Sequence, residues 1–399
     1  MFKGKKIALY VTGGIAVYKV VDLMRELIKN GAEVRVAMTP SACEFVSPLT
    51  FQVLSRHFIY LNTFEENDPE VVNHINIADW SDLALVAPAS ANTIAKLSAG
   101  LADNFVTSAL LATTAPVFIV PAMNANMYKN TVTQENIEKL KNRGHYVMTP
   151  DKGFLAEGYE GEGRFPEKTR ILDELKLAMR DQDMRLPLKG KTIIITAGGT
   201  KERIDPVRFI SNDSSGKMGH ALAEAAWRQG ATVKLITTSQ LETPGYIERL
   251  AVESAAEMYN EVHTLFKEAD ALVMAAAVSD YSPKNVEKKK MKKQNELTLE
   301  LKKNPDILME MGRIKAPQQC LIGFAAETDN IIEYAKEKLT AKHADLIVAN
   351  DVGKTDRGFN VDSNEVTLVS HTDEPKVISL QEKSKIAREI INWLIEYYN

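Results

Sequence analysis

Short apolar runs rich in β-branched residues alternate with longer amphipathic stretches along this 399-residue chain, and they do so in two successive series. The first series predicts strands over residues 7–11, 34–38, 83–87, 117–120 and 146–148, with helices over 15–29 and 131–142. The second predicts strands over residues 192–196, 233–237, 272–275, 321–324 and 346–349, with helices over 217–229 and 331–342. Such alternation is typical of βα units around a parallel sheet. The sequence therefore predicts an α/β protein with two doubly wound domains.

A charged stretch over residues 169–180, predicted as a helix, separates the two series. It runs into a polar segment marked by Pro187 and Gly190, which is typical of a linker. Lys-Gly-Lys at residues 3–5 and again at 189–191 precedes an apolar run that ends in Gly-Gly. We interpret these as two domain openings, which gives a domain over residues 1–180, a linker over 181–190 and a domain over 191–399.

The balance of 49 basic against 53 acidic residues gives a net charge of −4, so there is no general basic field for nucleic acid. No apolar run approaches the ~18 residues that would span a membrane, and the N-terminus lacks a signal-peptide pattern. Cys43 and Cys320 lie too far apart in sequence to suggest a disulfide framework or a thiolate zinc site. We expect a soluble cytoplasmic protein with neither a nucleic-acid nor a membrane partner.

Thr-Gly-Gly-Ile at residues 12–15 follows the first predicted strand and opens a helix, where free backbone amides can bind a phosphate. The dinucleotide fingerprint GxGxxG is missing, which disfavours a dehydrogenase and leaves a mononucleotide such as FMN. A plain strand-to-helix turn is the alternative interpretation.

Polar side chains follow two more predicted strands of the first domain, Ser90, Asn92 and Thr93 in one case and Asn124 in the other. Helix capping alone could explain Ser90. The Asn124 amide can donate to a carboxylate. His74 is a candidate for proton transfer, although an interior imidazole is the commoner role for a single histidine.

Five lysines in the six residues 288–293 lie between a predicted strand end and the segment Asn304-Pro-Asp306. A solvated loop is the usual explanation for such a charge run. The tract also follows a strand end, where open α/β sheets bind ligands, so a functional role is as well supported as a solvated loop.

The motifs of the two halves resemble those of two known families. The first half is similar to the homo-oligomeric flavin-containing cysteine decarboxylases in His74, residues 88–93, Pro-Ala-Met-Asn at 121–124 and a clamp at 153–164. The second half resembles phosphopantothenoylcysteine synthetases in residues 196–200, 205–212, 214–219, 276–281, 304–306, 323–328 and 344–350. Together the two resemblances cover nearly the whole chain and point to the bifunctional enzymes of coenzyme A biosynthesis.

For the second domain, the resemblance implies a Rossmann-like ligase that joins 4′-phosphopantothenate to L-cysteine with CTP and Mg²⁺, through an acyl-cytidylate. It implies catalytic roles for Asn212 and Lys290 and a metal contact for Asp280. The implied nucleotide-binding residues are Gly198, Gly199, Ser214, Ser215, Gly216, Lys217, Ala276, Asp280, Lys290, Asn304, Asp306, Phe324, Lys338 and Lys342.

For the first domain, the resemblance implies a flavodoxin-like flavoprotein that decarboxylates phosphopantothenoylcysteine to 4′-phosphopantetheine. His74 would transfer a proton and Asn124 would hold the substrate. The implied FMN-binding residues are Gly13, Gly14, Ile15, Ser90, Asn92, Thr93 and Met123. The family also implies a homo-oligomer with trimeric decarboxylase contacts and dimeric ligase contacts.

The clamp departs from the family pattern, because Ala156-Glu157-Gly158 stands where Ala-Cys-Gly is usual. In the family that cysteine is the acid of the reductive step, so Glu157 is the candidate replacement. An exposed loop residue is the alternative for Glu157. Relatives without the cysteine stop at the enethiol or are regulatory, which makes an active ligase fused to such a flavoprotein the second functional hypothesis.

Overall fold

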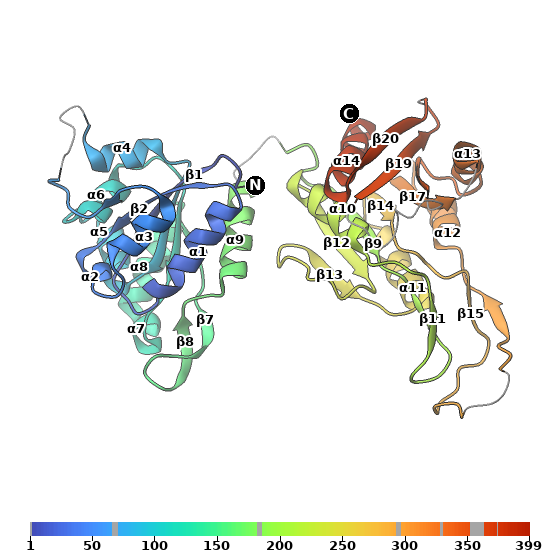
Figure 1. Cartoon of the computed structure of the whole chain (residues 1–399), viewed down its shortest axis with the longest axis horizontal. Coiled ribbons are helices and arrows are strands. Elements are labelled where there is room, and N and C mark those ends of the chain that lie inside the picture. The colour runs from blue at the N-terminus through green and yellow to red at the C-terminus, as the bar shows by residue number, and fades with distance from the viewer. Residues whose placement is uncertain are drawn as a thin grey trace. The chain divides into compact units, whose positions relative to one another are not determined.

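The computed structural model describes residues 2–65, 71–181, 186–292, 297–327, 330–351, 363–372 and 374–399. The chain divides into two compact units, Met1–Met179 and Arg180–Asn399, and each has a sheet of its own (Figure 1). Residues 182–185 of the expected linker lie outside the described residues.

The N-terminal unit is built on a six-stranded parallel sheet in the order β3-β2-β1-β4-β5-β6. Its strands are β1 (Lys6–Val11), β2 (Glu33–Met38), β3 (Ile59–Tyr60), β4 (Leu83–Ala89), β5 (Val117–Pro121) and β6 (Tyr146–Val147). The helices are α1 (Val17–Lys29), α2 (Pro40–Cys43), α3 (Pro48–Ser55), α4 (Asn73–Trp80), α5 (Ala91–Ala99), α6 (Phe105–Ala112), α7 (Ala125–Lys129), α8 (Thr131–Asn142) and α9 (Lys168–Asp181). A hairpin of β7 (Asp151–Phe154) and β8 (Glu160–Arg164) precedes α9.

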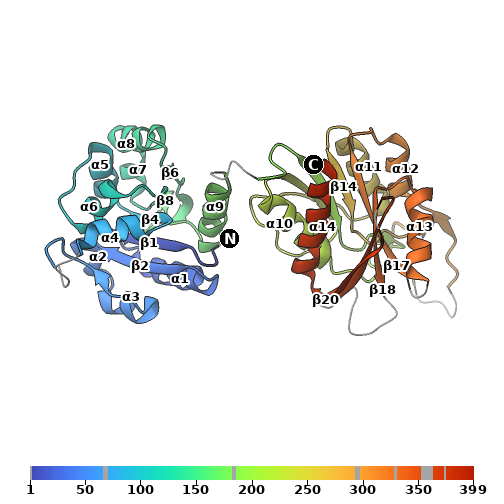
Figure 2. The ribbon, with the colours of Figure 1, turned by 90° about the horizontal axis from the view of Figure 1, so that it is seen from above.

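Alternation along β1 explains why this sheet has helices on both faces. Ile7, Leu9 and Val11 are buried in the core that includes residues of α1, α3 and α9. Ala8 and Tyr10 point to the other face, into the core formed with α4, α5, α6 and α8. Figure 2 shows the sheet between these two helix layers. A strand buried on both faces reads as the continuous apolar run seen in the sequence.

The C-terminal unit has an eight-stranded sheet in the order β13-β12-β9-β14-β17-β18-β19-β20. Six strands are parallel: β9 (Thr192–Ala197), β12 (Thr232–Thr237), β13 (Glu248–Ala251), β14 (Ala271–Met274), β17 (Cys320–Glu327) and β18 (Leu346–Asp351). Along the chain they follow the same order of positions as the six strands of the N-terminal sheet. The strands β19 (Ser363–Ser370) and β20 (Lys376–Glu382) extend this sheet in antiparallel fashion.

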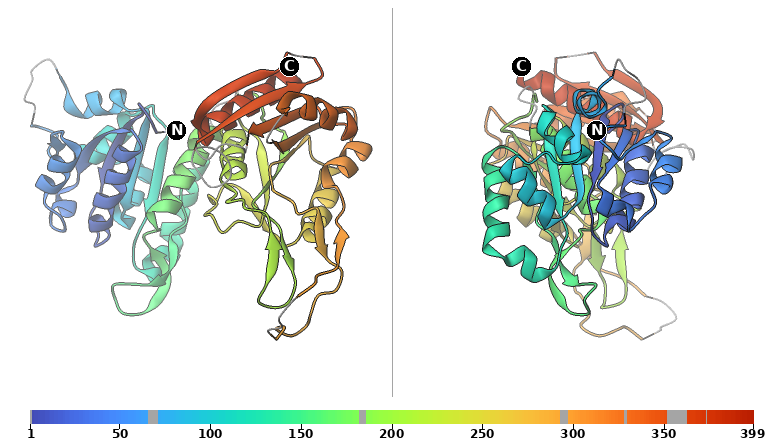
Figure 3. Two further views of the ribbon diagram at one scale, coloured as in Figure 1. Left: turned by 45° about the vertical axis from the view of Figure 1, so that its right-hand side comes forward. Right: turned by 90° about the vertical axis from the view of Figure 1, so that its left-hand side faces the viewer.

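The helices α10 (Lys217–Arg228) and α14 (Lys383–Tyr398) pack against each other on one face of the C-terminal sheet (Figure 2). Residues of α11 (Ala255–Phe266), α12 (Ile307–Ile314) and α13 (Ile331–Ala341) form the core on the other face. Two ribbons project from this unit, β10 (Lys201–Arg203) with β11 (Phe209–Ser211) and β15 (Tyr281–Pro283) with β16 (Leu301–Lys303). Figure 3 shows β11 and β15 extending to the same side.

The predicted class, two doubly wound α/β domains, is confirmed. The N-terminal strand order is the Rossmann order 3-2-1-4-5-6 and differs in detail from the flavodoxin order 2-1-3-4-5. The short edge strands β3 and β13 and the antiparallel pair β19–β20 were not predicted, since none has a long apolar run. Within the described ranges, no helix has the length and apolarity that crossing a membrane requires.

Candidate functional sites

A cavity of about 710 Å³ lies at the carboxyl ends of β1, β4 and β5, where the strand order of the N-terminal sheet reverses. Doubly wound sheets bind ligands at this switch point, and the volume suits a mononucleotide with part of a substrate. The cavity is lined by Gly13, Gly14, Ile15, Ala16, Tyr18, Lys19, Ser90, Ala91, Ala122, Met123, Asn124, Met127, Phe154, Leu155, Ala156, Glu157, Gly163, Arg164 and Phe165.

The turns after β1 and β4 are fastened to each other below this cavity. The Thr12 hydroxyl donates to the Pro88 carbonyl at 2.6 Å and accepts from the Ser90 backbone N–H at 2.9 Å. Gly13 packs so closely on α2 that a Cβ there would lie 2.5 Å from the Cβ of Ser41. The turn that precedes α1 is therefore fixed by a hydroxyl and by a glycine that no larger residue can replace without a shift.

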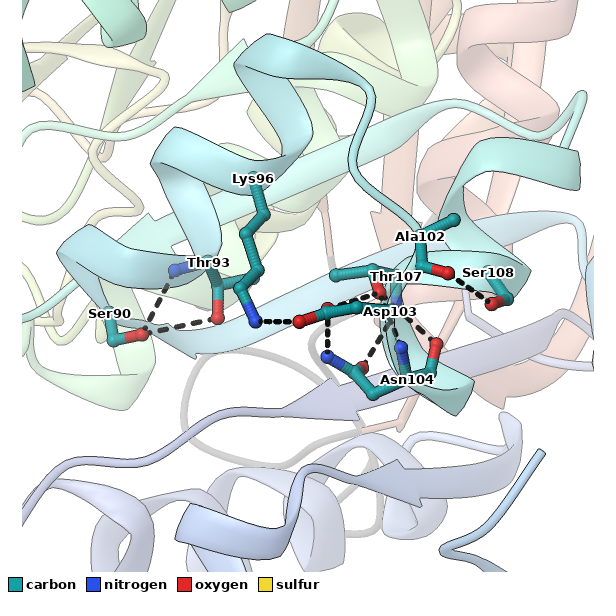
Figure 4. Close-up of polar contacts among 8 residues, drawn as sticks. All are labelled: Ser90, Thr93, Lys96, Ala102, Asp103, Asn104, Thr107 and Ser108. Carbon is teal, nitrogen blue, oxygen red and sulfur yellow. Dashed lines mark hydrogen bonds and ion pairs between the residues drawn. The ribbon is translucent and has the colours of Figure 1, made fainter.

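Ser90, Asn92 and Thr93 have three different environments. Ser90 lines the cavity and caps α5, since its hydroxyl accepts from the Thr93 N–H at 3.2 Å (Figure 4). Thr93 is buried, with its hydroxyl 3.1 Å from that of Ser90, and Asn92 is exposed. Neither Asn92 nor Thr93 lines the cavity, so within this unit only Ser90 of the three faces it.

Asn124 joins the end of β5 to the β7–β8 hairpin, which corresponds to the clamp. Its side-chain oxygen accepts from the Asn126 N–H at 2.8 Å, and its amide nitrogen donates to Glu157 Oε1 at 3.0 Å and to the Tyr159 hydroxyl. Gly163 approaches so closely that a Cβ there would lie 2.2 Å from the carbonyl oxygen of Met123. The hairpin is therefore seated on the β5 end, with Glu157 on the cavity wall.

His74 lies on α4, outside the lining of this cavity. Its ring meets Phe105 edge to face, with 6.4 Å between the ring centroids. Its Nδ1 is buried and has no hydrogen-bond partner among the described residues. One N-terminal unit thus brings Asn124 and Glu157 together but leaves His74 apart from them.

A second cavity, of about 320 Å³, lies at the carboxyl edge of the C-terminal sheet. It is lined by Asn212, Ser214, Ser215, Gly216, Lys217, Met218, Gly219, Ala275, Ala276, Ala277, Val278, Asp280, Phe324, Ala325, Ala326, Lys338, Asn350, Asn364 and Lys383. Three lysines and one aspartate are the charged groups in this lining, which favours an anionic ligand.

The Ser-Ser-Gly turn before α10 depends on close backbone approach. Gly216 has a φ of 80°, and a Cβ there would lie 2.7 Å from that of Ser239. The Ser239 hydroxyl donates to the Ser215 carbonyl at 2.8 Å, and His220 Nδ1 lies 3.0 Å from the Gly216 carbonyl oxygen. Burial lowers the pKa of His220, so the imidazole is held in its neutral form beside the turn. The backbone N–H groups at the start of α10 are thereby set to meet an anion.

Asn212 bridges two segments of the same cavity. Its side-chain nitrogen donates to the carbonyl of Val278 at 3.1 Å and to that of Ala277 at 3.4 Å. Gly199 approaches Asn212 so closely that a Cβ on the glycine would lie 2.3 Å from the asparagine carbonyl oxygen. Gly198 has a φ of 89° and packs against Thr238. These glycines shape the cavity from behind and do not line it.

The remaining predicted nucleotide residues lie outside the cavity lining. The Asn304 amide donates to the Ser279 carbonyl at 2.8 Å and accepts from the Ser282 hydroxyl at 2.7 Å. Asp306 caps α12 and forms an ion pair with Lys342. Asn304 thus holds the segment around Asp280, whereas the pair of Asp306 and Lys342 joins the start of α12 to the end of α13.

Lys290 is exposed, but its neighbour is anchored. The Met291 N–H donates to the buried carboxylate of Asp205 at 3.2 Å. Burial alone would raise the pKa of Asp205, yet backbone N–H donors and Arg208 hold it below its ordinary value. Lys293, in the same lysine tract, lies outside the described residues.

Comparison with known proteins identifies the family. A family model described as "DNA/pantothenate metabolism flavoprotein C-terminal domain" matches residues 188–398, and one described as "Flavoprotein" matches residues 1–179. The coenzyme A biosynthesis bifunctional protein CoaBC of Bacillus subtilis is 48% identical over 396 residues, 98% of this chain and 97% of the relative. This chain belongs to the CoaBC family.

The corresponding protein of Escherichia coli K12 is 41% identical over 401 residues, 99% of this chain and 98% of the relative. A crystal structure of the C-terminal domain of a CoaBC protein is 41% identical and covers 53% of this chain and 97% of its own, with a TM-score of 0.46. Membership of the CoaBC family confirms the resemblance drawn from the motifs. The chain is a bifunctional enzyme of coenzyme A biosynthesis, with a decarboxylase and a ligase activity.

Three polar residues of this CoaBC chain line the second cavity without having been predicted as site residues: Asn350, which ends the motif at 344–350, and Asn364 and Lys383, which lie outside every motif. All are buried, with exposed fractions of 8%, 3% and 6%. Asn364 and Lys383 belong to β19 and α14, so sequence reasoning about parallel strands alone missed them. The signal that could have found them is the polar residue at an end of each segment, Asn364 at the start of β19 and Lys383 at the start of α14.

Proposed function

We propose that the C-terminal unit joins 4′-phosphopantothenate to L-cysteine with CTP. In the first step a carboxylate oxygen of phosphopantothenate attacks the α-phosphorus of CTP and pyrophosphate leaves, which gives an acyl-cytidylate. In the second step the cysteine amine attacks the acyl carbon and CMP leaves. The observation that carries this proposal is the cavity in which the Ser-Ser-Gly turn, the N-terminus of α10 and three lysines meet.

The inner wall of this cavity also fits a nucleoside. The side-chain oxygen of Asn350 is buried without a hydrogen-bond partner among the described residues. An unsatisfied buried acceptor is costly, and a ligand with hydroxyl or amine donors relieves that cost. A nucleoside has such donors on its sugar and its base, whereas inorganic phosphate at neutral pH is chiefly an acceptor.

Asn212 and Lys290 are the proposed catalytic residues of ligation. Asn212 is held against the Val278 carbonyl at 3.1 Å, which leaves its side-chain oxygen to accept a hydrogen bond from the cysteine amine that attacks the acyl-cytidylate. Lys290 is the proposed source of positive charge on the phosphorus that undergoes attack, a role that requires one positioned cation. Its anchored neighbour, Met291, limits how far the loop can move.

Mg²⁺ is the proposed metal, with Asp280 as its protein ligand. The described residues hold no cluster of three or more His, Cys, Asp or Glu side chains able to bind a metal. Mg²⁺ commonly uses one or two carboxylates together with substrate phosphates and waters. A single exposed Asp280 on the cavity wall fits that pattern.

We propose that the N-terminal unit binds FMN and converts phosphopantothenoylcysteine to 4′-phosphopantetheine. The residues present fit FMN, because the cavity sits at the switch point and the Gly13 turn leaves no space for a side chain beneath it. Gly13, Gly14, Ile15, Ser90 and Met123 would hold it, with Asn92 and Thr93 acting through the fold of α5. When bound, FMN supplies the two-electron chemistry that oxidises the substrate thiol and returns the electrons after decarboxylation.

The chain's own groups then bind the substrate and move protons. Asn124 has an amide nitrogen on the cavity wall that can donate to the substrate carboxylate in exchange for Glu157. Glu157 is the proposed acid that protonates carbon after CO₂ leaves. His74 is the proposed proton-transfer residue. Because His74 does not line the cavity of its own unit, we propose that it acts at the cavity of a neighbouring subunit.

The homo-oligomer belongs to the proposal, with trimeric contacts between decarboxylase units and dimeric contacts between ligase units. Large apolar side chains are exposed on both units, among them Phe58 at 82% and Phe209 at 43%. Aromatic residues are enriched in interfaces between protein subunits, so these side chains are candidates for such contacts. Light scattering on the purified chain measures the assembly, and a monomer that turns over phosphopantothenoylcysteine would contradict it.

A coupled assay tests the whole proposal. The purified chain receives 4′-phosphopantothenate, L-cysteine, CTP and Mg²⁺, and products are followed by mass spectrometry and the flavin by absorbance. We expect pyrophosphate, CMP, phosphopantothenoylcysteine and then phosphopantetheine. Because Glu157 stands at the clamp, a second candidate is an active ligase with a flavoprotein that stops at the enethiol. Enethiol as the final product would select that candidate, and no CMP would overturn the ligase proposal.

A further inference from the structure

The antiparallel extension of the C-terminal sheet places a buried cation at the ligand cavity. After β18 the chain returns through β19 and β20, and α14 begins at Lys383 on the carboxyl edge of the sheet. Lys383 lines the cavity and is only 6% exposed. Asn364, 3% exposed, and Asn350, 8% exposed, belong to the same wall.

A lysine in this position is costly to the fold. Lysine is almost never fully buried unless it is paired, because removing an ammonium group from water is costly. A hydrophobic side chain at the start of α14 would fill the same space without that cost. The cavity that Lys383 lines gives this charge a role that filling space at the start of α14 does not require.

Two helix N-termini flank this cavity. α10 and α14 pack against each other, and their first residues, Lys217 and Lys383, both line the cavity. The N-terminus of a helix attracts anions, and a lysine at each start adds a full positive charge. The buried Asn350 oxygen without a partner among the described residues is independent evidence that a ligand completes this wall.

We infer that Lys383 binds a phosphate of the nucleotide beyond the α-phosphate, so that α10 and α14 hold the triphosphate from two sides. The Ser-Ser-Gly turn on α10 already provides backbone donors for one phosphate group. Three lysines around one cavity suit a ligand that carries more negative charge than a monophosphate. This inference rests on the proposed use of CTP.

Calorimetric titration of the full chain with CTP and with CMP tests this assignment. In Lys383→Met the side chain keeps its length and loses its charge. We expect CTP to bind about 10- to 150-fold more weakly, the range for losing a hydrogen bond to a charged group, and CMP to bind within about threefold of the original affinity. Lys385→Met is the matched control, since Lys385 is exposed two residues further along α14, and it should change neither affinity.

The outcomes separate this inference from the proposed function. If the unsubstituted chain does not bind CTP, the proposed ligase nucleotide is wrong. If it binds CTP and Lys383→Met binds CTP equally well, or loses CTP and CMP affinity alike, the Lys383 assignment is wrong. Tighter binding of 4′-phosphopantothenate than of pantothenate to the unsubstituted chain, with that preference lost in Lys383→Met, would place the substrate's phosphate at Lys383 and would also overturn it. If Lys383→Met fails to fold by circular dichroism, Lys383→Gln is measured against the same criteria.

Discussion

Glu157→Gln is the substitution that most directly tests how this chain completes the decarboxylase reaction. The enethiolate left by CO₂ release needs a proton on carbon before the electrons return, and Glu157 is the acid on the cavity wall nearest the clamp tip. Its Oε1 accepts from the Asn124 amide at 3.0 Å. A glutamine can still accept that hydrogen bond but has no acidic proton, so the substitution separates catalysis from positioning.

The expected magnitude follows from these contacts. A positioned general acid contributes about 10²- to 10⁴-fold, so we expect phosphopantetheine formation to slow by that factor. Glu157 is exposed and the acceptor is retained, so the free energy of unfolding should change by less than about 0.5 kcal/mol.

A single-turnover experiment with phosphopantothenoylcysteine measures both steps. We expect Glu157→Gln to release CO₂ at nearly the original rate and to accumulate the oxidised enethiol, with Glu157→Cys restoring phosphopantetheine. Unfolding in urea and the flavin content of each variant control for structural damage. Normal phosphopantetheine output from Glu157→Gln would refute the reasoning and transfer the role to water, His74 or another clamp residue.

Three further predictions concern the independence of the units, the ligase cation and the effect of pH. His74→Ala and Asn124→Ala should abolish decarboxylation and leave ligation within about twofold, because each unit has its own core; loss of CMP release by a folded variant would contradict this. Lys290→Gln should slow pyrophosphate release by about 10²- to 10³-fold and exposed Lys288→Gln by less than threefold, since one positioned charge is required; equal losses would indicate a diffuse field. Burial lowers the pKa of His220, so as the pH is lowered from 7.5 to 5.5 the unfolded chain takes up a proton that the folded unit resists. The free energy of unfolding should therefore decrease as the pH is lowered over this range. Urea titrations of the chain and of His220→Gln measure that slope, which should be smaller in the variant.

Much of the fold could be predicted from local pattern. The strand predicted over residues 7–11 and the helix predicted over 131–142 are found as β1 and α8. A strand buried on both faces has a continuous apolar run, and a helix buried on one face has apolar residues at helical spacing, so both can be recognised in the sequence. The turns at Gly13 and Gly216 could also be predicted from their glycines. The structure explains these glycines, since both backbones approach neighbouring residues too closely for a Cβ. The family could be named from motifs because these turns belong to the motifs that carry the resemblance.

The sequence by itself determined most of the elements and the turns proposed to bind ligands, and only the tertiary structure decided which of them meet. Lys383 is more than a hundred residues from the Ser-Ser-Gly turn in sequence, yet both line one cavity, because β19 and β20 return to the same edge of the sheet. Thr93 lies buried beneath Ser90, and Asp306 pairs with Lys342, although the motifs suggested ligand contacts for all of them. His74 lies apart from Asn124 within its own unit. Local periodicity reports which face of an element is buried, whereas the pairing of strands is a long-range choice that fixes the neighbours of each side chain.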